Sequence, residues 1–131
     1  DPTSVWKVAT VTKDYDGRIL VVQHSGDVSE SLSVNKYELP PLRNPDILIG
    51  SSDLSALSYL HEPAILQCLA NRFVQKRVIY TYSGIVLVAI NPYCELQIYG
   101  NDQIANYRGK GIGDLDPHVY ALAEEAFRRM E

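Results

Sequence analysis

The sequence has little of what marks secreted, membrane-spanning or nucleic-acid-binding proteins. Its 131 residues include two cysteines, Cys68 and Cys94, which lack a CxxC spacing, and no Asn-x-Ser/Thr sequon. This scarcity favours a reduced, intracellular compartment. The longest purely apolar run, Ile85–Ile90, is far too short to span a bilayer. With 12 Lys and Arg against 16 Asp and Glu and no basic block, the net charge of −4 gives no electrostatic reason to expect nucleic acid or an anionic membrane as partner.

The N-terminus has neither an initiator methionine nor the basic and then apolar pattern of a signal peptide, since it begins Asp1-Pro2. The chain is therefore either processed or begins inside a longer gene product. Its length and its 46% apolar residues are enough for one ordinary domain with a core.

The first forty residues carry β signals. Val5–Val11 and Ile19–Val22 are rich in β-forming apolar residues, and apolar and polar residues roughly alternate over Val28–Val34. Asp16-Gly17 and Ser25-Gly26-Asp27 supply turn residues between these runs, because glycine accepts the positive φ of tight hairpins. The pattern predicts a small antiparallel barrel or meander.

A proline-rich stretch, Leu39–Pro45, then interrupts regular structure and indicates a domain boundary. After it, Asp53 is expected to cap a short helix, and Glu62-Pro63 opens a longer one with proline at a favoured first position. The apolar residues of that longer helix fall on one predicted core-facing side: Ile65, Leu66, Leu69 and Phe73.

Two apolar runs, Val78–Tyr82 and Ile85–Ile90, flank Ser83-Gly84 and predict a β-hairpin. The second run is apolar on both faces, so we expect other elements to cover it on both sides, as in a central sheet. Asn91-Pro92 ends this strand abruptly.

A short helix is predicted around Asp102–Tyr107, followed by a glycine-spaced loop and a final helix with Asp116 as cap and Pro117 in the first turn. The apolar residues of the final helix recur at helical spacing and need a partner surface: Val119, Leu122, Ala123, Ala126, Phe127 and Met130.

Two motifs resemble catalytic or binding signatures but lack key positions. Gly109-Lys110 is reminiscent of a phosphate-binding loop, yet Ile104 stands where the upstream glycine belongs, and Gly111 replaces the Ser or Thr that would hold Mg²⁺. His61-Glu62 begins like the zinc motif HExxH, but Ile65 occupies the place of the second histidine. We interpret the first as a loop and the second as a helix entry, and find no self-contained catalytic constellation.

The Asn91-Pro92 turn leaves two interpretations open from residue types alone. Ligands of α/β sheets gather at the carboxyl ends of strands, so a rigid proline with Tyr93 and Tyr99 forms a slot suited to a planar base. Alternatively, the proline stops the strand and the two tyrosines pack on the surface.

Two long segments, Leu57–Leu66 (LSYLHEPAIL) and Ile79–Tyr93 (IYTYSGIVLVAINPY), closely resemble the myosin motor domain in order and spacing. Ile98–Gly100 and Asp116–Phe127 continue the resemblance. Within that family, Leu39–Leu48 and Asp53–Leu60 look like class V myosins, the processive cargo carriers.

The resemblance implies an α/β fold. Residues 1–41 would be an SH3-like N-terminal barrel lacking its first strand, and residues 42–131 the helices and strands that begin the P-loop-containing motor fold. It also implies that Asn91, Pro92 and Tyr99, with Tyr93 adjacent, line the purine pocket for ATP. Gln97 departs from the proline usual in this loop.

The implied function is that of an actin-based motor that couples MgATP hydrolysis to movement along actin, with cargo transport in the cytoplasm. Catalytic residues, phosphate and Mg ligands, actin-binding surfaces and the sites for calmodulin-type light chains would lie outside this segment, as would the dimer contacts of a class V protein. We expect a strand and then the phosphate loop GESGAGKT shortly after it. The alternative is a stand-alone SH3-like interaction module without catalysis.

Overall fold

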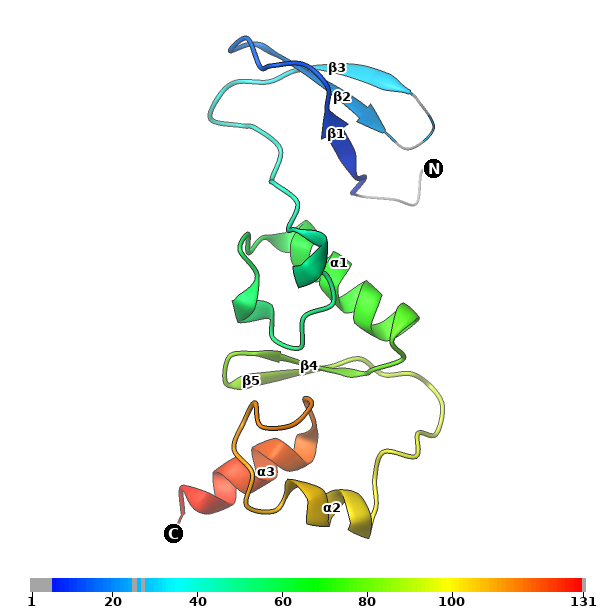
Figure 1. Cartoon of the computed structure of the whole chain (residues 1–131), viewed down its shortest axis with the longest axis vertical. Coiled ribbons are helices and arrows are strands. Elements are labelled where there is room, and N and C mark those ends of the chain that lie inside the picture. The colour runs from blue at the N-terminus through cyan, green and yellow to red at the C-terminus, as the bar shows by residue number, and fades with distance from the viewer. Residues whose placement is uncertain (1–5, 25, 27, 131) are drawn as a thin grey trace. The chain divides into compact units, whose positions relative to one another are not determined.

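The computed structural model describes residues 6–24, 26 and 28–130. The chain divides into two compact units, Asp1–Arg43 and Asn44–Glu131 (Figure 1). Each unit has its own secondary structure, and the candidate site lies entirely in the second.

The first unit is a three-stranded antiparallel meander in the order β1-β2-β3. Its strands are β1 (Ala9–Val11), β2 (Ile19–His24) and β3 (Ser29–Ser33). Leu20 and Val22 of β2 alternate onto one face and are buried, as a period of two predicts. Among the described residues no pairing joins β1 to β3, so the sheet does not close and the SH3-like barrel is not confirmed.

The turn between β1 and β2 is built on the carboxylate of Asp16. Its Oδ1 accepts hydrogen bonds from the backbone N–H of Arg18 (2.8 Å) and of Ile19 (2.7 Å), while Gly17 takes a φ of 93°. The bonds from Ile19 and Arg18 hold the pKa of Asp16 below its ordinary value. For the turn predicted at residues 25–27, Ser25 and Asp27 lie outside the described residues, as does Val5 at the predicted start of the first strand.

The second unit places a β-hairpin between two groups of helices (Figure 1). On one side lie two 3-10 helices and α1, which continues into a π-helical turn, and on the other lie α2 and α3. The bounds are η1 Asp46–Leu48, η2 Leu54–Ala56, α1 Glu62–Ala70, η3 Asn71–Gln75, β4 Tyr80–Ser83, β5 Val86–Ala89, α2 Asn101–Tyr107 and α3 Val119–Arg128.

The hairpin turn is formed by Gly84 and Ile85, because Ser83 pairs with Val86. Gly84 has a φ of 60°, and positive φ at the first central position alone is the pattern of a type II′ turn, which matches the twist of the strands. The predicted hairpin is confirmed, with its turn one residue later than Ser83-Gly84.

Each face of the hairpin contacts a different apolar cluster. Val88 packs on the first cluster and Leu87 on the second, as expected of successive residues in a strand. The first cluster is built on Leu54, Leu57, Ala64 and Cys68, and the second on Tyr82, Tyr107 and Ala121. Cover on both sides of this strand is therefore confirmed for its middle residues. Ile85 and Val86, near the turn, are exposed, and in the described chain β5 pairs with β4 alone.

The predicted inner face of α1 is partly wrong. Its buried residues are Ala64 and Cys68, one turn apart, with Ile65 and Leu69 packed beside them. Leu66 is exposed, because it lies on the opposite side from that pair. Small residues at the centre let the helix approach Leu54 and Leu57 closely.

Of the two helix caps predicted from Asp residues, one is confirmed and the other is wrong. Asp53 caps η2 as predicted, since its Oδ1 accepts from the backbone N–H of Ser55 at 2.8 Å. Asp116 is wrong as the cap of α3, because His118 occupies the extended residue before Val119 and its Nδ1 accepts from the Tyr120 N–H at 3.1 Å.

Candidate functional site

The loop between β5 and α2 carries the four residues predicted to contact a purine. It begins with a turn in which Asn91 Oδ1 accepts a hydrogen bond from the Tyr93 N–H at 2.9 Å. Tyr93 has a φ of 52° and its side chain is 92% exposed. Asn91 therefore shapes the turn, and the Tyr93 ring lies in solvent.

An open hollow of about 360 Å³ lies in this loop. Two of the four predicted residues, Pro92 and Tyr99, line it, whereas Asn91 and Tyr93 do not. The remaining lining residues are Ile79, Cys94, Glu95, Leu96 and Gln97. Gln97 supplies a polar side chain to the wall of the hollow.

Tyr99 is held by its hydroxyl and by its ring. Its Oη lies 2.8 Å from the Oη of Tyr80 in β4, and either hydroxyl can be the donor. Its ring contacts those of His118 and Tyr120, with centroids 5.6 and 6.3 Å apart. Burial, and then the bond with Tyr99, raise the pKa of Tyr80 to about 12, so the Tyr80 hydroxyl keeps its proton at neutral pH. Tyr99 is 49% exposed, which leaves part of its ring available to a ligand.

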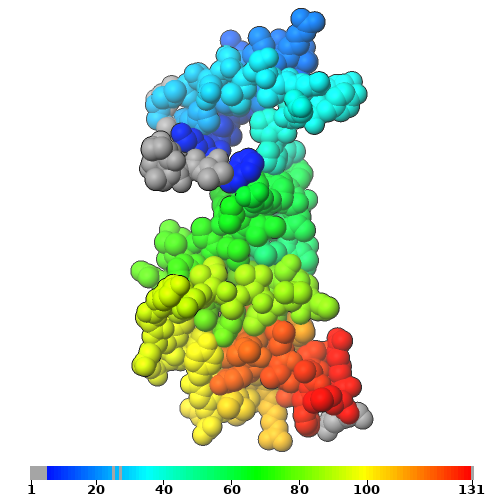
Figure 2. Space-filling model, turned by 180° about the vertical axis from the view of Figure 1, so that it is seen from behind, coloured from blue at the N-terminus to red at the C-terminus, as the bar shows by residue number. Residues whose placement is uncertain are grey.

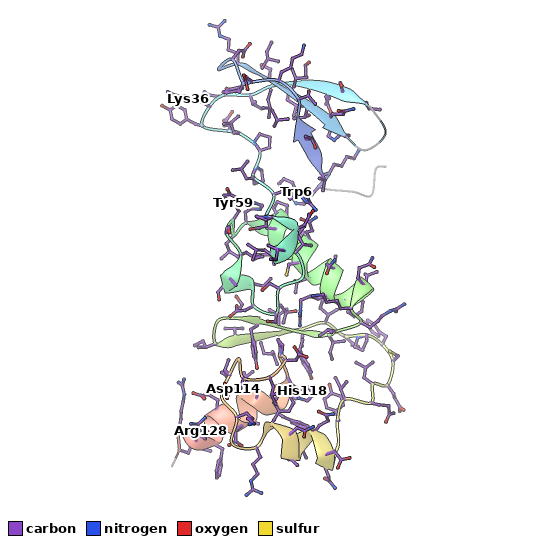
Figure 3. The ribbon with its side chains drawn as sticks, in the orientation of Figure 1. Trp6, Lys36, Tyr59, Asp114, His118 and Arg128 are labelled. Carbon is purple, nitrogen blue, oxygen red and sulfur yellow. The ribbon has the colours of Figure 1, made fainter. Side chains whose placement is uncertain are left out.

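His118 is the buried centre of this region and lies between the hairpin and α2 (Figure 3). Because its Nδ1 accepts from the Tyr120 N–H, the neutral ring carries its proton on Nε2 and donates it to the Ile98 carbonyl at 3.0 Å. Tyr107 of α2 stacks on the ring at 5.0 Å, and Tyr80 meets it edge-on at 5.2 Å. Burial lowers the pKa of His118, partly offset by the bond to Ile98. The neutral tautomer therefore fits both contacts.

Residue-by-residue interpretation of the sequence missed Tyr80 and His118. The three histidines are scattered along the chain, and Tyr80 is one of nine tyrosines. The one local signal was the position of His118 directly before a strong helix, where an extended residue with a side-chain acceptor serves as cap.

Arg72 was also missed, and it holds the edge of the hairpin from within the core. Its side chain is buried, with Nε donating to Thr81 Oγ1 at 2.8 Å and Nη2 to the Tyr80 carbonyl at 2.7 Å. Burial lowers the pKa of Arg72, but an arginine remains charged at neutral pH. This side chain thereby fixes the strand from which the Tyr80 hydroxyl projects.

The glycine-spaced loop has its backbone donors already engaged by carboxylates. The Gly109 N–H donates to Glu124 Oε1 at 2.8 Å, and the Gly111 N–H to Asp114 Oδ2 at 2.7 Å. A phosphate at these amides would have to displace two anionic side chains. The geometry thus favours a closed loop over a phosphate cradle.

Two further features are absent from the described residues. Across 6–24, 26 and 28–130, no group of three or more His, Cys, Asp or Glu side chains is placed to hold a metal ion. In the same part of the chain, none of the helices has the length and apolar character needed to cross a membrane.

Comparison with known proteins identifies the family. The family described as myosin head (motor domain) matches residues 51–131. The chain is 54% identical over 134 aligned residues to unconventional myosin-Va of Gallus gallus and 53% identical over 132 to unconventional myosin-Vc of Homo sapiens, each covering 99% of the chain. It is 51% identical over 105 residues, 79% of its length, to myosin-2 of Lachancea kluyveri.

The matched stretch is 7% of the length of the Gallus gallus protein and of the Lachancea kluyveri protein, and 8% of that of the Homo sapiens protein. The match of the family to residues 51–131 spans the hairpin, the Asn91–Tyr99 loop and the His118 region. This part of the chain consists of helices and one two-stranded antiparallel sheet, β4-β5. The chain belongs to the myosin head (motor domain) family.

Proposed function

We propose that this chain is the purine-contact segment of an actin-based motor that couples MgATP hydrolysis to movement along actin filaments, in a class V protein that transports cargo. The observation that carries the proposal is that Pro92 and Tyr99, seven residues apart, line one hollow. Family membership and the similarity to unconventional myosins Va and Vc support the motor function.

The hollow suits a base better than a phosphate. Its volume of about 360 Å³ lies within the roughly 300–1,000 Å³ typical of small-molecule pockets. Pro92 and the exposed part of the Tyr99 ring offer apolar contact to a planar ring system. No lysine or arginine is among the lining residues, and Glu95 would repel a phosphate. A carboxylate and the Gln97 amide accept hydrogen bonds from the exocyclic amine of a base.

In this proposal the chain binds and orients the base, and Asn91 and Tyr93 contribute through the shape of the turn. Bound MgATP supplies the phosphoryl group that water attacks in line, and the phosphate and Mg ligands belong to regions outside this segment. Actin filaments, calmodulin-type light chains and a second heavy chain are the proposed partners, also through other regions. Cytoplasm and actin cytoskeleton are the proposed location.

For the remaining architecture, we assign residues 1–41 to the SH3-like barrel that precedes the motor and residues 42–131 to the beginning of the motor fold. The three-stranded meander supports this assignment as part of such a barrel. The opposing hypothesis is a stand-alone SH3-like interaction module. A coding region that continues into GESGAGKT favours the motor, and one that lacks it contradicts the motor.

The test of the base contact is Tyr99→Ala in the full-length motor. Losing one aromatic contact to a base costs about 1–3 kcal/mol, so we expect ATP affinity to fall about fivefold to 150-fold. Affinity for inorganic tripolyphosphate, which has no base, should stay unchanged. Tyr37→Ala, at a tyrosine that is 82% exposed in the first unit, is the matched control. Unchanged ATP affinity in Tyr99→Ala contradicts the proposal.

A further inference from the structure

We propose that Tyr80 and His118 are positioning residues. By fixing the orientation of Tyr99, they set the affinity of the site for the nucleotide base. The inference rests on the proposed function, because it assumes that Tyr99 contacts the base. It adds two side chains that contact neither base nor phosphate in that scheme. Both lie outside the loop, one in β4 and the other at the start of α3.

Tyr80 controls the hydroxyl end of Tyr99. The two hydroxyl oxygens lie 2.8 Å apart, and Tyr80 itself is buried. A phenol has one donor and two acceptor sites, so this bond commits part of the Tyr99 hydroxyl and fixes its orientation. The Tyr80 backbone is in turn held by β4 pairing with Ala89 and by Arg72. The anchor is therefore more rigid than the residue that it holds.

His118 controls the backbone next to Tyr99. Its Nε2–H donates to the carbonyl of Ile98, the residue directly before Tyr99, while its ring contacts the Tyr99 ring. Helix capping at Nδ1 and stacking against Tyr107 fix the imidazole itself. The hydrogen bond spans 20 residues, so it ties the end of the loop to α3.

In the part of the chain that the structure describes, the other half of the loop has no comparable anchor. Tyr93, Cys94 and Glu95 are exposed, whereas Ile98 is half-buried beside His118. Figure 2 shows the segment that carries residues 91–100, in yellow, beside the start of α3, in orange. The wall of the hollow that contains Tyr99 is thus anchored by Tyr80 and His118, whereas the opposite wall is exposed to solvent. Substitutions of the two anchoring residues should therefore change the contact between Tyr99 and the base.

The first variant is Tyr80→Phe in the full-length motor, which removes one hydroxyl and keeps the ring. Loss of one neutral hydrogen bond that positions Tyr99 should lower ATP affinity about twofold to tenfold. Affinity for inorganic tripolyphosphate should not change. Tyr15→Phe is the matched control, because it also removes one tyrosine hydrogen bond, the one to the Val34 carbonyl at 2.7 Å in the first unit. That control should leave affinity for both probes unchanged.

The second variant is His118→Asn, which separates helix capping from loop anchoring. Asparagine is among the best helix caps, so the bond to the Tyr120 N–H should persist. Its side chain is too short to reach the Ile98 carbonyl as well. We expect weaker ATP binding with unchanged tripolyphosphate binding and a helical content equal to that of the parent motor.

The outcomes separate this inference from the proposed function. If Tyr99→Ala weakens ATP binding while Tyr80→Phe and His118→Asn leave it unchanged, the positioning roles are wrong and the purine loop stands. If Tyr99→Ala has no effect either, both are wrong. If the variants weaken ATP and tripolyphosphate equally, the effect is general destabilisation and the positioning roles are also wrong.

Discussion

At the scale of single residues, His118 joins three tasks in one imidazole: it caps α3, anchors the loop at Ile98 and fills the space among four tyrosine rings. All of these contacts suit the neutral ring. Protonation would place a second N–H at Nδ1, facing the Tyr120 N–H that it now accepts from. Protonation of His118 should therefore break its hydrogen bond to the Tyr120 N–H, which caps α3.

This coupling predicts a pH dependence of the start of α3. The folded pKa of His118 lies below the ordinary value of 6.5, so the unfolded state binds more protons in that range. Stability from this group is complete above 6.5 and declines as pH falls from 6.5 through the folded pKa. As the pH is lowered from about 7.5 to about 5.5, hydrogen exchange at the first turn of α3 in the full-length motor should become faster. The rates are compared after correction for the intrinsic pH dependence of exchange. His118→Asn should abolish this pH dependence, and an unchanged slope would contradict the assignment.

Arg72 gives a second prediction at this scale. Arg72→Met leaves Thr81 Oγ1 and the Tyr80 carbonyl without their charged donor in a buried place. Hydrogen bonds to charged groups contribute about 1.5–3 kcal/mol each, so the thermal midpoint of the motor should fall by several degrees. Arg77→Met, at an exposed arginine nearby, is the control and should leave the midpoint unchanged. Equal midpoints for the two variants would contradict a structural role for Arg72.

Site residues within one continuous loop could be predicted from the sequence, whereas residues that contact the loop from distant parts of the sequence could not. The prediction of Pro92 and Tyr99 rests on a family pattern that lies in one continuous loop, and both residues line the hollow. Tyr80 and His118 act on that loop across 19 and 20 residues, respectively, so no local pattern reveals them. The outward position of Tyr93 depends on a backbone turn that residue types alone do not determine.

At the scale of elements, the hairpin is tied to the turn before it by Asp53. Its Oδ1 accepts from the Ser55 N–H and Oγ and also from the Gly84 N–H at 3.1 Å, which joins η2 to the type II′ turn. Burial opposes ionisation of this carboxyl, and the hydrogen bonds from Gly84 and Ser55 outweigh it, so the pKa of Asp53 is lowered.

Asp53→Ala should therefore destabilise two elements at once. Loss of a helix cap alone costs about 1 kcal/mol, and the Gly84 bond adds to that. We expect faster hydrogen exchange in both the 53–57 turn and the 83–86 turn of the full-length motor. Asp53→Asn retains an acceptor oxygen and should show a smaller effect at both. Faster exchange at the first turn alone would contradict the link between them.

Element predictions succeeded where local periodicity or turn chemistry decided the outcome. The hairpin, the short helix and the final helix all form close to their expected positions. The cap of α3 was wrong because Asp116 looks like a cap in sequence, whereas the backbone of His118, with φ −156° and ψ 151°, occupies that place. The π-helical turn at Asn71–Gln75 has no sequence signature that was recognised.

At the scale of the whole molecule, several large apolar side chains lie exposed on the second unit. Ile85 is 75% exposed, Phe127 is 53% exposed and Met130 is 78% exposed. Such surface is characteristic of interfaces. We expect the isolated 131-residue chain to unfold without a sharp cooperative thermal transition and to self-associate, as measured by calorimetry and light scattering. A monomer with a single sharp transition would instead favour the stand-alone module.

The central claim is that the Asn91–Tyr99 loop contacts the base of a bound nucleotide. The most direct measurement is photolabelling of the full-length motor with ATP that carries an azide on the purine ring, followed by mass spectrometry of the labelled peptides. The account predicts label within residues 91–99 that an excess of unmodified ATP suppresses. Label confined to peptides outside this loop would contradict it.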